Sequence, residues 1–150
     1  MEQRIDVQEK GQKALKALFG INGYLKNSAI EPALKELVYF RVSQINRCAY
    51  CLDMHYKDAR AKGESEQRLY GLSAWRESPY YTSRERAAFA WAEAVTKCDV
   101  PCDIYDEVKE HFTDEALIDL TLAVTTINTW NRLNHAFPNT PGTYQVGQFG

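Results

Sequence analysis

Residues 36–55 read ELVYFRVSQINRCAYCLDMH and predict two helices joined by a short break. Pro32 suits the first turn of the earlier helix. Asn46 and Arg47 mark the break, and the later helix runs from about Cys48 to Lys62, just before the helix-ending signal Gly63. The apolar positions of the earlier helix recur at helical spacing: Leu34, Leu37, Val38, Phe40 and Ile45.

Helical periodicity continues on both sides of this block. Thr82 or Ser83 can cap a helix that carries Phe89, Trp91 and Val95. Strand-like alternation is absent from the sequence, and the closing segment PNTPGTYQVGQFG is rich in turn residues. We therefore expect an all-α fold, a bundle of roughly six or seven helices in one domain over residues 1–150, with the motif core at about 30–75. The remaining helices are expected at about 12–26, 65–74, 101–112 and 113–137.

The composition is that of an ordinary globular protein. The 150 residues are 45% hydrophobic and 25% charged. The net charge of −2 offers no excess of positive charge for binding nucleic acid or an anionic membrane. A membrane-spanning helix needs about 20 consecutive apolar residues, and the chain has no such run. The charged N-terminal stretch does not resemble a secretory signal, so we expect a cytoplasmic protein whose thiols are kept reduced.

Cys48, Cys51 and His55 fall on one stripe of the later helix, because each residue turns about 100°. Cys48 lies in the first turn, where the helix dipole favours a thiolate. His55 follows Cys51 by four residues, so its imidazole can approach that sulfur and accept the thiol proton. The stripe thus supplies a nucleophile, a base and a second thiol that can close a disulfide.

This stripe has four interpretations. Haem attachment requires histidine directly after the second cysteine, where this chain has Leu52. Structural zinc needs four ligands, and three on one rigid stripe converge poorly on a tetrahedral ion. Plain core cysteines are the third interpretation, and a redox-active pair, which we favour, is the fourth. A fourth zinc ligand would have to come from Cys98, Cys102, His111 or a carboxylate.

The motif resembles that of a known family. Glu36, then Cys-x-x-Cys from Cys48 to Cys51, then His55, is similar to the core signature of the AhpD-like alkylhydroperoxidases in the carboxymuconolactone decarboxylase superfamily. The later segments RERAAFAWAEAVT and INTWNRLNHAF also resemble single-domain members, so that the resemblance covers roughly residues 30–145.

The resemblance implies a mechanism and an assembly. Cys51 would attack a hydroperoxide, and Cys48 would condense with the resulting sulfenic acid to a disulfide. His55, Glu36 and a water would form the proton relay, and an external dithiol would reduce the disulfide. Relatives form homo-oligomers, commonly trimers or hexamers. The helix dipole favours Cys48 as the more acidic thiol, whereas the proton acceptor beside Cys51 favours Cys51. We assign the attack on the peroxide to Cys51.

Other residues carry weaker signals. Tyr50 stands where relatives carry a second histidine, and it either lines the substrate entrance or packs. Cys98 and Cys102 flank Pro101, and sequence alone gives no basis for a bridge between them.

We therefore expect a thiol-dependent peroxidase or disulfide oxidoreductase in antioxidant defence. It needs no prosthetic group, because the cysteine pair carries the electrons. One alternative is a zinc-binding structural protein that uses the Cys-Cys-His stripe, which predicts stoichiometric metal. Another is a lactone decarboxylase of the same superfamily, whose members do not depend on the cysteine pair.

Overall fold

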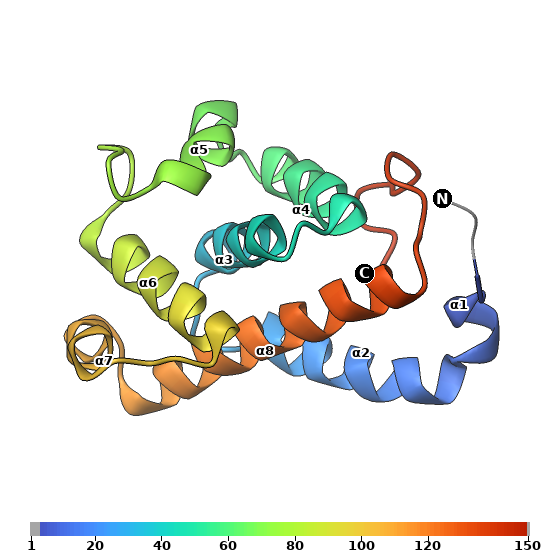
Figure 1. The fold of residues 1–150 in the computed structure, drawn as a ribbon, viewed down its shortest axis with the longest axis horizontal. Coiled ribbons are helices and arrows are strands. Elements are labelled where there is room, and N and C mark those ends of the chain that lie inside the picture. The colour runs from blue at the N-terminus through green and yellow to red at the C-terminus, as the bar shows by residue number, and fades with distance from the viewer. Residues whose placement is uncertain (1–3, 150) are drawn as a thin grey trace.

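The computed structural model describes residues 4–149, whose regular secondary structure is entirely helical, with no strand (Figure 1). The all-α prediction is confirmed. The described residues contain eight α-helices rather than six or seven, because the single turn α1 carries no apolar face that a periodicity would reveal. The helices are α1 (Val7–Lys10), α2 (Gln12–Lys26), α3 (Pro32–Ile45), α4 (Ala49–Ala61), α5 (Glu66–Gly71), α6 (Ser83–Lys97), α7 (Cys102–Lys109) and α8 (Asp114–Ala136), with a 3₁₀ turn at Leu72–Ala74.

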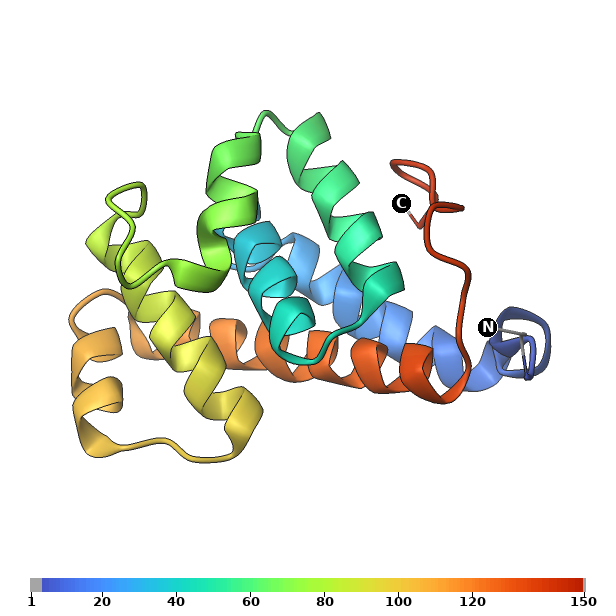
Figure 2. The same ribbon diagram turned by 45° about the horizontal axis from the view of Figure 1, so that its top comes forward.

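Helix α3 forms the centre of the bundle. It packs against α4, α6 and α8 and lies across the long α8 (Figure 2). Because neighbours surround it, α3 buries polar positions as well as apolar ones, among them Lys35, Glu36 and Ser43. The most buried helix of the fold thus places a carboxylate in the interior. The apolar side chains that α3 adds to the core are Leu34, Leu37, Val38, Phe40 and Val42.

The helix starts follow the chemistry expected from the sequence. Pro32 opens α3, and the side chains of Ser65, Thr82 and Thr113 cap α5, α6 and α8. At Thr82 the cap is reciprocal, since the Glu85 carboxylate accepts from the Thr82 N–H. These bonds satisfy N–H groups that a helix start leaves without partners.

The link between α3 and α4 is short and determines where the cysteines lie. Arg47 has a left-handed backbone with φ 56°, and Cys48 occupies the N-cap of α4. The Cys48 N–H donates to the carbonyl oxygen of Ser43, so the chain folds back on the end of α3 at once. Gly63, with φ 91°, follows the other end of α4, where the sequence predicts the helix to stop.

The C-terminal tail, residues 138–149, is irregular, as its turn-rich sequence predicts. It leaves the end of α8 and turns back beside α4 (Figures 1 and 2). Among the described residues, no helix is both long and apolar enough to cross a membrane.

Candidate functional site

Cys48 and Cys51 form a disulfide at the start of α4. The N-cap position of Cys48 and the first-turn position of Cys51 bring their Cα atoms to 5.3 Å, within the range that a disulfide requires. Cys48 is 2% exposed and Cys51 is 1% exposed. Cys51 lines a cavity of the protein, whereas Cys48 does not. The two sulfurs therefore differ in their access to a small molecule.

Glu36 of α3 contacts two side chains of α4. Its Oε2 lies 3.1 Å from His55 Nδ1, and its Oε1 accepts from Lys62 Nζ at 2.5 Å. Glu36 and His55 are both buried, while half of the Lys62 side chain is exposed. The structure thus brings Glu36 and His55 together, as the family resemblance implied.

The charges around Glu36 keep it ionised. Burial alone would raise the pKa of Glu36, but the hydrogen bonds and charges of His55 and Lys62 outweigh burial and hold that pKa below its ordinary value. A carboxylate is therefore present at neutral pH to orient the imidazole. Because its acceptor oxygen faces Nδ1, the tautomer with the proton on Nδ1 is the one that matches this contact.

With Nδ1 engaged, the other imidazole nitrogen is available. His55 Nε2 is buried and has no hydrogen-bond partner among the described residues. A buried polar atom without a partner is uncommon and calls for a water or a ligand. His55 and Cys51 line the same cavity one helical turn apart, so a group between them can reach both. The Tyr39 ring packs on the imidazole at 5.2 Å between centroids and limits its movement.

The cavity that reaches Cys51 has a volume of about 480 Å³. Helices α2, α3, α4 and α8 and the C-terminal tail all contribute to its walls. Tyr50 is one of the lining residues and is buried, which agrees with the expectation that it lines the entrance or packs. The apolar and aromatic part of the lining includes Phe19, Met54, Ile127, Trp130, Tyr144 and Phe149.

Sequence reasoning missed Lys62 as a partner of Glu36. Lys62 follows His55 by seven residues, which is two helical turns, so it shares the face of α4 that meets Glu36. That spacing is a signal that could have revealed it. Asp58 and Tyr144 were also missed: the Tyr144 hydroxyl donates to Asp58 Oδ1 at 2.8 Å across 86 residues, a pairing that no local pattern indicates.

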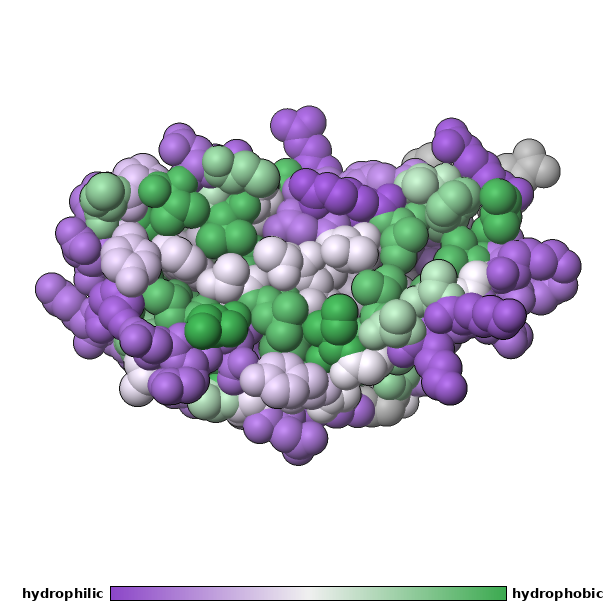
Figure 3. Space-filling model, turned by 90° about the horizontal axis from the view of Figure 1, so that it is seen from below, coloured by the Kyte–Doolittle hydropathy of each residue, from purple (hydrophilic) through white to green (hydrophobic). Residues whose placement is uncertain are grey.

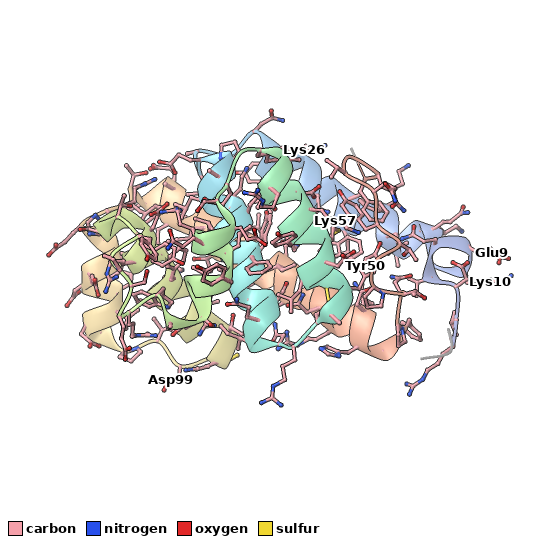
Figure 4. The ribbon with its side chains drawn as sticks, turned by 90° about the horizontal axis from the view of Figure 1, so that it is seen from above. Glu9, Lys10, Lys26, Tyr50, Lys57 and Asp99 are labelled. Carbon is pink, nitrogen blue, oxygen red and sulfur yellow. A yellow bond between two sulfur atoms is a disulfide. The ribbon has the colours of Figure 1, made fainter. Side chains whose placement is uncertain are left out.

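The second pair of cysteines lies elsewhere. Cys98 and Cys102 are free, exposed thiols at the junction of α6 and α7. Figure 4 places Asp99, from the same junction, well away from Tyr50 beside the disulfide. These cysteines are therefore not part of the site around Cys51.

Potential metal ligands also gather at the site, but without sulfur. Ligand atoms of Glu36, His55 and Asp58 all lie within 4.8 Å of one another. Lys62 and Tyr144 already donate to the two carboxylates. In the disulfide form, Cys48 and Cys51 offer no thiolates, so this form does not provide the Cys-Cys-His zinc stripe considered from the sequence.

A comparison with protein-family models agrees with the fold and the Cys-x-x-Cys motif. The family model for the carboxymuconolactone decarboxylase family matches residues 12–94, which extend from α2 through most of α6. The chain belongs to this family, and its fold is that of the AhpD-like group.

Individual relatives extend the similarity over nearly the whole chain. The chain is 41% identical to the uncharacterized protein YdfG of Bacillus subtilis, over 93% of this chain and 97% of YdfG. A crystal structure of ATU0492 from Agrobacterium tumefaciens, a protein of unknown function suggested to be the antioxidant defence protein AhpD, is 38% identical and superposes with a TM-score of 0.91. That superposition covers 95% of this chain and 100% of ATU0492.

More distant structures share the fold alone. The debrominase Bmp8 superposes with a TM-score of 0.81 at 21% identity, over 90% of this chain and 74% of Bmp8. The comparisons thus assign the chain to the carboxymuconolactone decarboxylase family, with an AhpD-like fold.

Proposed function

We propose that the protein is a thiol-dependent peroxidase that reduces hydroperoxides through Cys51 and Cys48. The observation that carries this proposal is the position of Cys51, which lines a cavity together with His55, while His55 is held by Glu36. The AhpD-like class of the fold supports the same activity. The antioxidant role and a cytoplasmic location are part of this proposal.

The reaction begins from the reduced pair. His55 Nε2, directly or through a water, accepts the proton of the Cys51 thiol, and Glu36 stabilises the imidazolium that forms. The thiolate attacks one peroxide oxygen and the O–O bond breaks. Cys51 becomes a sulfenic acid, and the alcohol or water leaves after it takes the proton back from His55.

The second step closes the disulfide. The Cys48 thiol attacks the Cys51 sulfenic sulfur, which releases water and gives the bond seen here. An external dithiol then supplies two electrons and two protons, and becomes a disulfide itself. The 5.3 Å separation of the Cα atoms lies within the range that a disulfide requires, which supports this step.

Free thiols and peroxide consumption in three proteins test this proposal. With a small dithiol present, the wild type should turn over and Cys51→Ser should fail to do so; sulfenic acid is measured after one addition of peroxide with the dithiol removed. Cys48→Ser should still form one sulfenic acid per chain, whereas Cys51→Ser should form none. If Cys51→Ser still forms sulfenic acid at Cys48, the assigned order is wrong.

The same preparation separates the alternative functions. Stoichiometric zinc in the reduced protein, with loss of the fold on chelation, would support the zinc-binding structural protein. Turnover of a lactone by Cys51→Ser would support a decarboxylase. The peroxidase proposal expects neither result.

We also propose that the chain forms a homo-oligomer, a trimer or hexamer as the family resemblance implies. Hydrophobic residues gather on the face seen from below, along which α8 and α2 run (Figure 3). Ile118 of α8 is 66% exposed, and Tyr24 of α2 is 57% exposed and donates to Asp119 next to it. Light scattering on the wild type and Ile118→Lys tests this proposal, since a single charge in a buried interface should yield smaller particles.

A further inference from the structure

The C-terminal tail supplies one wall of the cavity in front of Cys51. Tyr144, Val146 and Phe149 of the tail all line it. Tyr144 is 3% exposed, although the segment around it is irregular and largely open to solvent. An aromatic side chain this deeply buried in a turn-rich tail indicates a segment that is docked in place.

Three residues of α4 hold the tail. Lys57 Nζ donates to the carbonyl oxygens of Tyr144 and Gly142, at 3.0 and 3.3 Å. Asp53 Oδ2 accepts from the Gly142 N–H at 3.0 Å. Asp58 accepts from the Tyr144 hydroxyl through both oxygens, at 2.8 and 3.0 Å. We call these contacts the tail latch.

The backbone conformation of Gly142 allows one of the contacts of the tail latch. Gly142 has φ 91°, a conformation that glycine adopts without strain, and this turn directs its N–H to Asp53. Lys57 bridges the two sides of the latch, since it also pairs with Asp53 at 2.8 Å. In Figure 4, Lys57 lies on α4 next to the tail.

The wall that the tail provides is aromatic. Phe149 stacks on Tyr144 with 5.8 Å between ring centroids, and Phe149 also contacts Phe19 of α2 at 6.2 Å. Phe19 continues to Trp130 of α8 at 5.4 Å. A row of four rings therefore runs from the tail across α2 to α8, along the cavity.

The size of the cavity exceeds what hydrogen peroxide needs. Hydrogen peroxide has two non-hydrogen atoms, and a water molecule occupies about 30 Å³ in the liquid. A volume of about 480 Å³ instead falls in the range of sites that enclose a drug-sized organic molecule. Apolar walls of this size gain binding free energy only from an apolar group that removes them from water.

We propose that the latched tail is the specificity wall of the site and selects hydroperoxides that carry a bulky aromatic or branched apolar group. This inference rests on the proposed peroxidase function. The organic group packs against the row of rings, and the peroxide group extends to Cys51. The chemistry is that given above: the O–O bond breaks, Cys51 gains one oxygen, and the organic alcohol leaves.

The test compares cumene hydroperoxide with hydrogen peroxide in the full chain. Hydrogen peroxide reports the chemistry at Cys51, so the ratio of the two kcat/KM values isolates recognition of the organic group. Tyr144→Ala should lower this ratio by roughly tenfold or more, chiefly through KM for cumene hydroperoxide. Lys57→Met, which releases the tail and leaves its rings intact, should lower the ratio in the same direction.

Tyr70→Phe is the matched control, because Tyr70 is 68% exposed and lies outside the cavity lining. It should leave the ratio unchanged. If Tyr144→Ala and Lys57→Met also leave the ratio unchanged, the tail is not a specificity wall. Circular dichroism of each variant establishes that the helices are retained.

A binding measurement separates this inference from the proposed function. The product alcohol 2-phenyl-2-propanol should bind the disulfide form and change the fluorescence of Trp130, a change that Trp130→Phe should abolish. Tyr144→Ala should weaken this binding by roughly tenfold. If binding depends on the tail but no hydroperoxide is turned over, the proposed peroxidase function is wrong, and the tail still binds apolar groups. Absent binding, or equal binding by Tyr144→Ala, would overturn the wall itself.

Discussion

The Glu36 carboxylate lies 3.1 Å from Nδ1 of His55, on the side of the imidazole away from Nε2, which has no partner within residues 4–149. One contact therefore fixes both the tautomer and the direction of the ring. Because α3 is surrounded by α4, α6 and α8, its carboxylate has little freedom to move. This geometry makes Glu36 the residue through which the proposed basicity of His55 can be tested.

Glu36→Gln should lower the rate constant for the oxidation of Cys51 by peroxide. The amide keeps the shape but removes the negative charge that stabilises the imidazolium, so we expect a loss of about 10²- to 10⁴-fold, the usual contribution of general base catalysis. Stopped-flow measurement of thiol loss in the reduced protein gives this rate constant. Glu77→Gln, at an exposed glutamate, is the control and should react like the wild type.

The pKa of Glu36 predicts how stability depends on pH. This pKa is lower in the folded than in the unfolded protein, so the ionised Glu36 side chain stabilises the fold above the ordinary glutamate pKa. This contribution to the free energy of unfolding is lost as the pH falls through the pKa of the folded state. Lys62→Met removes one of the groups that lower the pKa, so the folded pKa of Glu36 lies closer to its ordinary value and less stability should be lost between neutral and acid pH. Urea unfolding between about pH 3 and 7 measures this. Identical pH profiles for the two proteins would contradict it.

Glu93 of α6 makes a buried cluster of polar contacts that includes Arg41 of α3. Its buried carboxylate accepts from Arg41 at 2.8 Å, from Arg76 at 2.7 Å and from the Trp75 indole at 2.9 Å. Glu93→Ala leaves the Trp75 indole N–H and the largely buried Arg41 guanidinium without this acceptor and should lower the free energy of unfolding by about 3–5 kcal/mol. Urea denaturation tests this value. Glu93 does not line the cavity, so the folded fraction should still react with peroxide at the wild-type rate.

The exposed thiols of Cys98 and Cys102 predict a simple titration. The disulfide form should show two thiols that react with a coloured thiol reagent without denaturant, and the reduced form should reveal the other two more slowly, because they are buried. A Cys98→Ser, Cys102→Ser double variant should show none in the disulfide form and keep its peroxide rate. A marked loss of rate in this variant would give these cysteines a role that their position does not suggest.

Local sequence signals were sufficient for most of the fold. Thr82 and Pro32 were enough to predict the starts of α6 and α3, since each signal acts within a few residues. The pairing of Glu36 with His55 was expected from the family motif, and the structure brings these residues together. Their catalytic roles stay a prediction, as does the single-domain assignment over residues 1–150.

The missed part of the site depends on tertiary contacts. The tail was expected to be irregular, and it is, but nothing in PNTPGTYQVGQFG indicates that Tyr144 would dock on Asp58. Such a contact depends on where α8 ends relative to α4, which is set by the packing of the whole bundle. Single-residue patterns carry no information about that distance.

The unequal access to the two sulfurs has a consequence for how electrons enter the protein. Thiol–disulfide exchange passes through a mixed disulfide, so the reductant must bring its own sulfur into line with one of the two. Only Cys51 lines the cavity, so the incoming thiolate would join Cys51 and expel Cys48 as the leaving group. The route then favours a slender dithiol that can enter past the aromatic rings over the broad surface of a folded redox protein.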